Sequence, residues 1–140
     1  MRACLLDTGP IIAYLDSRDP AHPEVAAFLD SFSGRLLTTG AVITEAMHFL
    51  AAVPEGPLIL AEFVAASDTL VYDLAQPPEL RAAAALMLKY SETPMDYADA
   101  TLILLAETSN VQDILTLDRR GFRIFRTRHR KALRLVLDHV

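Results

Sequence analysis

Short apolar runs alternate with longer amphipathic segments along the whole chain. Continuous runs rich in Leu, Ile, Val and Thr predict buried strands at residues 2–6, 36–37, 69–72 and 111–117. Apolar residues spaced by three and four predict helices at 11–15, 21–33, 40–53, 57–67, 77–90 and 94–106. This alternation predicts an α/β fold of three layers, α/β/α, with a central, mainly parallel sheet in a single domain over residues 1–140.

Proline and glycine mark the boundaries between these segments. Gly9 and Pro10 interrupt the first apolar run, and the stretch 54–57, with two prolines and a glycine, predicts a tight connection between two helices. Thr93 and Pro94 are predicted to open a late helix, with proline at its favoured first position. Thr38 or Thr39 is the expected N-cap of the helix that follows the second strand.

The C-terminal segment has an ambiguous pattern. Residues 118–121 match a type I turn, because Asp and Gly are preferred at its first and last positions. Residues 122–126 are then expected to form a strand, and 132–137 a closing hairpin strand. Leu133, Val136 and Leu137 also fit a helical period, so the segment 122–140 is interpreted as a basic hairpin or a helix.

Acidic residues stand where the predicted strands end. Asp7 and Asp118 each close an apolar run, and in open α/β sheets ligands bind at the carboxyl ends of the strands. Each also has a structural explanation, since Asp7 can cap a helix and Asp118 can begin a turn. Glu45 lies in a predicted helix whose other residues are mostly apolar, so the helix has little polar surface for a glutamate.

Two further acids lie three residues apart on one predicted helix, and therefore on one face of it. Asp96 stands three residues after Thr93, where a capping box places an acidic or amide side chain, so it is interpreted as a helix-start residue or a further ligand. Asp99 precedes the apolar stretch 100–106 and is expected near the buried face, which makes it the better ligand.

Together these carboxylates predict a divalent-metal site. Clustered carboxylates raise one another's pKa unless a cation neutralises them. Mg²⁺ or Mn²⁺, which prefer oxygen ligands, fit such a set better than Ca²⁺, because no run of alternating acids is present. The four histidines and the single Cys4 have no zinc-ligand spacing, and Cys4 is interpreted as a small buried hydrophobe.

The net charge of −5 is unevenly distributed. Eight of the 13 Lys and Arg residues follow Asp118, and a single acid lies among them. Such a cationic segment suits phosphate contacts, although a solvated surface or an acidic protein partner explains it equally well. The residues of this segment expected to make such phosphate contacts are Arg119, Arg120, Arg123 and Arg126.

Four stretches of the chain resemble the PIN domain family, the ribonuclease fold of VapC-type toxins. They are Leu5–Gly9, Thr44–Glu45, Met95–Leu102 and Leu115–Phe122, in the same order and spacing over essentially the whole chain. The resemblance implies a metal-dependent endoribonuclease, the toxin of a toxin–antitoxin pair, in which Asp7, Glu45, Asp99 and Asp118 hold the metal. It also implies that Thr8 and Thr116 orient these ligands or a water.

The same resemblance implies an RNA substrate, a cognate antitoxin and a homodimer. A second interpretation keeps the fold without catalysis, as a regulatory module whose acidic pocket binds a cation or a partner's arginine. A phosphoaspartyl phosphatase is disfavoured because Gly9 stands where a second aspartate is needed, and a receiver domain because arginines, not a lysine, follow Asp118.

The composition bounds the location of the chain. With 52% hydrophobic and 22% charged residues it has material for one continuous core. No window approaches the roughly 20 apolar residues that a membrane span needs. The apolar start is interrupted by Asp7 and Gly9, so no signal-peptide core is predicted and the cytoplasm is the expected location.

Overall fold

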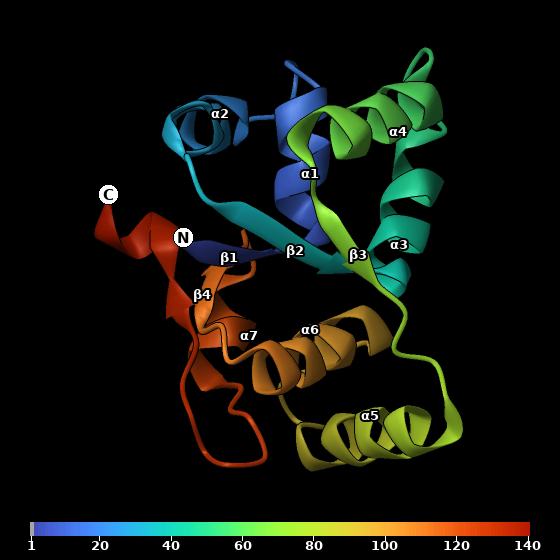
Figure 1. The fold of residues 1–140 in the computed structure, drawn as a ribbon, viewed down its shortest axis with the longest axis vertical. Coiled ribbons are helices and arrows are strands. Elements are labelled where there is room, and N and C mark those ends of the chain that lie inside the picture. The colour runs from blue at the N-terminus through green and yellow to red at the C-terminus, as the bar shows by residue number, and fades with distance from the viewer. Residues whose placement is uncertain (1) are drawn as a thin grey trace.

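The computed structural model describes residues 2–140, in which helices and strands alternate as the sequence pattern predicts (Figure 1). The strands are β1 (Ala3–Leu6), β2 (Arg35–Thr39), β3 (Leu70–Tyr72), β4 (Asp113–Leu115) and β5 (Arg134–Leu135). The helices are α1 (Thr8–Leu15), α2 (His22–Ser31), α3 (Gly40–Leu50), α4 (Gly56–Ser67), α5 (Pro77–Lys89), α6 (Tyr97–Ser109) and α7 (Arg119–Ile124), and a 3₁₀ turn, η1 (Val136–His139), follows β5.

The strands form one five-stranded sheet in the order β3-β2-β1-β4-β5, and every pairing in it is parallel. The predicted α/β class and parallel sheet are confirmed. From β1 the chain adds strands first on one side and later on the other, so the strand order reverses between β1 and β4. Such a switch point leaves a crevice at the carboxyl ends of the two strands.

Helices cover both faces of the sheet, which confirms the three layers. In Figure 1, α1, α2 and α4 lie on one side of the strands, and α6 and α5 lie on the other. Helix α6 is the most buried helix, because every residue from Ala100 to Ala106 is buried. It packs between β2 and α5, and this packing fixes the position of its N-terminal acids.

The first helix begins earlier than predicted. Asp7 is its N-cap and accepts a hydrogen bond from the backbone N–H of Thr8, so α1 starts at Thr8 rather than Ile11. Gly9 and Pro10 lie inside the first turn, where proline is tolerated because its missing N–H needs no partner there.

The predicted strand at 122–126 is wrong, because residues 122–124 belong to helix α7 and Arg126 makes only an isolated bridge. Asp118 caps the helix by accepting the Gly121 N–H at 3.0 Å, and Phe122 and Phe125, three residues apart, are both fully buried. The capping bond and the spacing of the aromatic rings together favour a helical turn over a strand.

The predicted hairpin at the C-terminus is also wrong. A single antiparallel bridge joins Arg126 to Ala132, but β5 pairs with β4 in parallel and the chain then turns into η1. Leu133, Leu135 and Leu137 are all buried, but only Arg134–Leu135 of this stretch is a strand, and Val136 is buried as well. Among residues 2–140, no helix has the length and apolar character to cross a membrane.

Candidate functional site

The acids named from the sequence line one cleft at the carboxyl ends of β1 and β4. Asp7 follows β1, and its backbone N–H donates to the carbonyl of Leu115 on β4. The cleft has a volume of about 280 Å³. Its acidic lining residues are Asp7, Glu45, Asp96, Asp99 and Asp118, with Thr8 beside them. Side chains from β1, α3, the start of α6 and the end of β4 therefore converge at the switch point of the sheet.

Asp7 is the most buried of these acids, with 7% of its surface exposed. Its Oδ1 accepts from the Thr8 N–H at 2.8 Å and its Oδ2 accepts from the Thr116 hydroxyl at 2.7 Å. Burial, with smaller contributions from the negative charges of Glu45 and Asp96, raises the pKa of Asp7 to about 6 against the lowering effect of the two hydrogen bonds. The two bonds fix the carboxylate but do not neutralise it.

Asp96 and Asp99 form a reciprocal cap at the start of α6. Asp96 Oδ1 accepts from the Asp99 N–H at 2.8 Å, and Asp99 Oδ2 accepts from the Asp96 N–H at 3.1 Å. The helix thus begins at Tyr97, and the predicted start at Thr93 and Pro94 is wrong, because Asp96 itself is the N-cap. Burial, followed by the charges of Asp96 and Asp7, raises the pKa of Asp99 to about 8.

Glu45 and Asp118 complete the acidic lining. Glu45 is half-buried on α3, whose start is fixed by Thr39, since the Thr39 hydroxyl accepts from the Val42 N–H. Asp118 is exposed, and its backbone N–H donates to the Thr116 hydroxyl at 3.0 Å. One hydroxyl, that of Thr116, therefore connects the Asp7 carboxylate with the backbone of Asp118.

A methyl group at position 121 is expected to displace the Asp118 carboxylate. The Cβ of Gly121→Ala would lie 2.4 Å from Asp118 Oδ2 and 3.0 Å from the Phe125 ring. The exposed carboxylate moves more easily than the buried ring, so we expect Mn²⁺ affinity to fall about tenfold. The melting temperature should fall by about 3–5 °C, because the N-cap bond from the Gly121 N–H to Asp118 weakens. Isothermal titration with Mn²⁺ measures the affinity, and an unchanged affinity would contradict the prediction. Gly40→Ala is the control, because its Cβ meets nothing closer than 4.0 Å.

The donor set suits a hard divalent cation, although the side chains are not closed around one. Among residues 2–140, no three His, Cys, Asp or Glu side chains are arranged as a ready metal-ligand set. The chemistry nevertheless fits, because carboxylates with raised pKa values share one cleft, and the buried Thr8 hydroxyl beside Asp7 has no hydrogen-bond partner in the described part of the chain. An unpaired buried hydroxyl is rare and fits a water or ion ligand as its missing partner.

The raised pKa values predict that the metal-free protein loses stability as pH increases. The unfolded chain releases these protons near the ordinary aspartate pKa of 3.8, whereas the folded chain holds them to about 6 at Asp7 and about 8 at Asp99. The folded state binds more protons in this range, so the free energy of unfolding falls as pH rises.

We therefore expect the melting temperature in EDTA to drop between about pH 5 and about pH 8.5, and Mn²⁺ to reverse the drop at the higher pH. Differential scanning fluorimetry measures both effects. Asp99→Asn should flatten the curve, and a melting temperature that rises across this range in EDTA would contradict the assignment.

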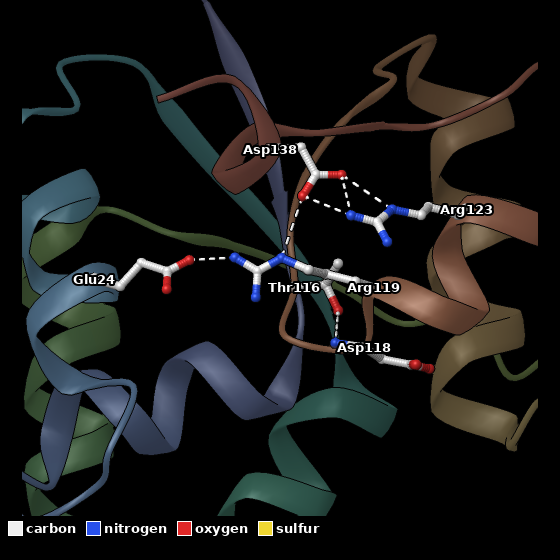
Figure 2. A network of polar contacts seen from close by, with 6 residues as sticks. All are labelled: Glu24, Thr116, Asp118, Arg119, Arg123 and Asp138. Atoms are coloured by element: carbon white, nitrogen blue, oxygen red, sulfur yellow. Dashed lines mark hydrogen bonds and ion pairs between the residues drawn. The ribbon is translucent and has the colours of Figure 1, made fainter.

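Two of the arginines expected to contact RNA are held in ion pairs instead of facing solvent freely. Figure 2 shows Arg119 between Glu24 and Asp138, and Arg123 beside Asp138. Arg126 donates from one terminal nitrogen to the carbonyls of Arg123, Ile124 and Phe125, which caps the end of α7. Arg120 is exposed.

Sequence reasoning missed two features of this region. Glu24 and Asp138 pair with Arg119 across sequence separations that no local pattern reveals, although Asp138 is the single acid after residue 118. A larger hollow of about 580 Å³ adjoins the acidic cleft and shares Glu45, Phe49 and Asp96 with it. The sequence pattern predicted the helices that line this hollow, but it did not predict that their apolar side chains form a hollow on the surface.

Comparisons with known proteins agree with this fold. A family model described as the PIN domain matches residues 4–127. Ribonuclease VapC26 of Mycobacterium tuberculosis (strain ATCC 25618 / H37Rv) is 31% identical over 126 residues, which cover 87% of this chain and 91% of that protein. The crystal structure of M. tuberculosis VapC20, a toxin that cleaves the sarcin-ricin loop, matches with a TM-score of 0.76. That match has 16% identity and covers 84% of this chain and 92% of VapC20, so it is evidence for the fold alone.

Proposed function

Because the chain belongs to the PIN domain family, we propose that it is a metal-dependent endoribonuclease and the toxin of a toxin–antitoxin pair. One observation carries the proposal: five carboxylates from four separate segments line a single cleft at the switch point of the sheet. The names of the matching VapC proteins support RNA as the substrate. We further propose that the cleavage is endonucleolytic and depends on Mg²⁺ or Mn²⁺.

The residues of the cleft have distinct roles in this reaction. Asp7, Asp99 and Asp118 would hold the cation, Glu45 would hold it or orient the attacking water, and Asp96 would fix the Asp99 backbone by capping α6. A bound divalent cation activates a water and neutralises charge on the phosphoryl oxygens. Thr116 keeps the Asp7 carboxylate in one orientation, and the unpaired Thr8 hydroxyl is available to a water in the cleft.

We assign the phosphate contacts to arginines near the cleft whose side chains remain available. Arg120 follows Asp118 by two residues and is exposed, so we propose that it contacts the RNA backbone. Arg126 shares this role only through the donors that its capping of α7 leaves available. Backbone contacts of this kind give affinity without sequence preference, so they do not identify the RNA that is cleaved.

Cleavage of RNA by the purified protein tests the proposed function. We expect Mg²⁺ or Mn²⁺ to support internal cleavage of a structured RNA, EDTA to stop it, and Asp7→Asn to remove it. A single-stranded DNA of the same sequence is the substrate control. Cleavage that persists in EDTA would contradict the metal-dependent reaction. Cation binding without cleavage of any RNA would favour a regulatory module.

We infer that the protein forms a homodimer and binds an antitoxin. Large apolar side chains on α3 and α4 are exposed, with 55% of Phe49, 58% of Leu58 and 37% of Ile59 accessible to solvent, and such a patch is typical of an interface. Light scattering after size exclusion should give twice the 15.4 kDa chain mass. Leu58→Glu should shift it toward the monomer, and a monomer in the unmodified protein at micromolar concentration would refute the dimer.

A further inference from the structure

The carboxylate of Asp138, in the last turn of the chain, binds two arginines of α7. Its Oδ1 accepts from Arg119 Nε at 3.2 Å and from a terminal nitrogen of Arg123 at 3.1 Å. Its Oδ2 accepts from Arg123 at 3.2 Å and 3.0 Å, a two-pronged contact of the strong kind. Arg119 also pairs with Glu24 of α2, so these four side chains, named here the α7 clamp, join three distant segments (Figure 2).

The α7 clamp acts directly on the helix that Asp118 begins. Asp118 is the N-cap of α7 and Arg119 is its first residue. A helix of six residues has little stability of its own, so outside contacts decide where it lies. Phe122 fixes its buried face, and the α7 clamp fixes the exposed face through Arg119 and Arg123.

The α7 clamp also directs positive charge away from the acidic cleft. Figure 2 shows the Arg119 guanidinium pointing toward Glu24 and Asp138, while the Asp118 carboxylate points the other way. Arg119 follows Asp118 in sequence, so a guanidinium without its two carboxylate partners would be free to pair with Asp118. A cation would then have to compete with that arginine for the carboxylate.

We propose that Asp138, together with Glu24, positions Asp118 for cation binding by holding Arg119 and Arg123 in the α7 clamp. The expected effect on catalysis rests on the proposed function, whereas the effect on cation binding can be measured without it. Asp138 is a positioning residue: it does not line the acidic cleft, its hydrogen bonds are to Arg119 and Arg123, and its effect passes through α7. The C-terminal turn is therefore part of the machinery of the site.

The competing role for these arginines is direct contact with RNA phosphates. The two roles predict different changes in the KM for RNA and in Mn²⁺ binding. If Arg123 binds RNA, Asp138→Asn frees a cation and removes a negative charge, so the KM for RNA falls, whereas Arg123→Gln raises it. If the α7 clamp positions Asp118, both substitutions weaken Mn²⁺ binding and lower kcat together, and the KM for RNA stays nearly constant.

Asp113 provides a matched control at the other end of β4. It too accepts from two arginines, Arg2 and Arg134, and its side chain is 21% exposed against 25% for Asp138. Asp113→Asn removes the same charge and the same kind of ion pair without touching α7. Any effect of Asp138→Asn beyond that of Asp113→Asn therefore reports position and not overall charge.

The experiment measures Mn²⁺ binding by isothermal titration to the full chain without RNA, followed by cleavage kinetics. We expect Asp138→Asn and Arg123→Gln each to raise the Kd for Mn²⁺ by about 3- to 10-fold, and Asp113→Asn to leave it within about twofold. Equal Kd values for Asp138→Asn and Asp113→Asn would overturn the proposal, as would opposite shifts in the KM for RNA. Glu24→Gln tests the other end of the α7 clamp if Asp138→Asn folds poorly.

The outcomes separate this proposal from the proposed function. A wild-type protein that binds Mn²⁺ but cleaves no RNA, with weaker binding in Asp138→Asn, would refute the ribonuclease and support the positioning role. A wild-type protein that cleaves RNA, with all variants binding Mn²⁺ equally, would refute the positioning role alone.

Discussion

Asparagine at position 99 is expected to reduce metal-dependent RNA cleavage by about 100-fold or more, while the metal-free protein becomes more stable. A ligand carboxylate contributes several kcal/mol through the cation, and each 1.36 kcal/mol changes the rate about tenfold. Stability moves in the opposite direction because the folded state holds Asp99 at a raised pKa, so an uncharged side chain removes that penalty. The amide oxygen can still accept the Asp96 N–H.

The opposed changes distinguish a ligand from a residue that merely supports the fold. Cleavage assays with Mn²⁺ and thermal melts in EDTA measure the two effects on the same preparation. A loss of activity together with a lower melting temperature would indicate a structural role for Asp99, and would argue against the ligand assignment. Asp113→Asn should change neither quantity strongly, since Asp113 lies at the opposite end of β4.

Asp96 should respond differently from Asp99. It is exposed and caps α6, and asparagine is as good an N-cap as aspartate. Asp96 lines the cleft and also accepts the Asp99 N–H, and an asparagine amide oxygen can accept that hydrogen bond as well. The two interpretations drawn from the sequence, helix-start residue and ligand, are both compatible with this geometry, although the cap sits at Asp96 itself and not at Thr93.

The central part of the fold was predictable because local signals and long-range packing agree there. An apolar run that ends in an acid, as at Leu6 and Asp7, indicates both a buried strand and the edge at which it ends. Parallel strands place such ends side by side, which is why Asp7 and Asp118 could be expected to meet before any contact was known.

The C-terminal region was not predictable in the same way, because its structure depends on partners far away in sequence. The three-residue spacing of Phe122 and Phe125 favours a helical turn, and the Asp118 cap begins that turn. Arg119 and Arg123 look like free cations in the sequence, and only the fold brings Asp138 and Glu24 to them. Charge counted along the chain therefore does not reveal which arginines are engaged in ion pairs.

Glycine 56 is expected to be the position where a single methyl group most damages the fold. The Cβ of Gly56→Ala would lie 1.9 Å from the carbonyl oxygen of Leu50 and 2.8 Å from its carbonyl carbon. Both atoms are backbone at the end of α3, so the junction between α3 and α4 must shift. We expect a loss of about 3 kcal/mol, as for severe overpacking of a core, and a melting temperature lower by about 10 °C.

Gly40→Ala makes the same chemical change with the opposite expectation. Its Cβ would meet nothing closer than the carbonyl oxygen of Tyr72 at 4.0 Å, and Gly40 is the first residue of α3. Alanine there restricts the unfolded chain without strain, so stability should rise by about 0.5 kcal/mol. Chemical denaturation of both variants measures the difference. Equal stabilities would mean that the contact at Leu50 relaxes freely, and the α3–α4 junction would then not be what holds α3, and with it Glu45, in place.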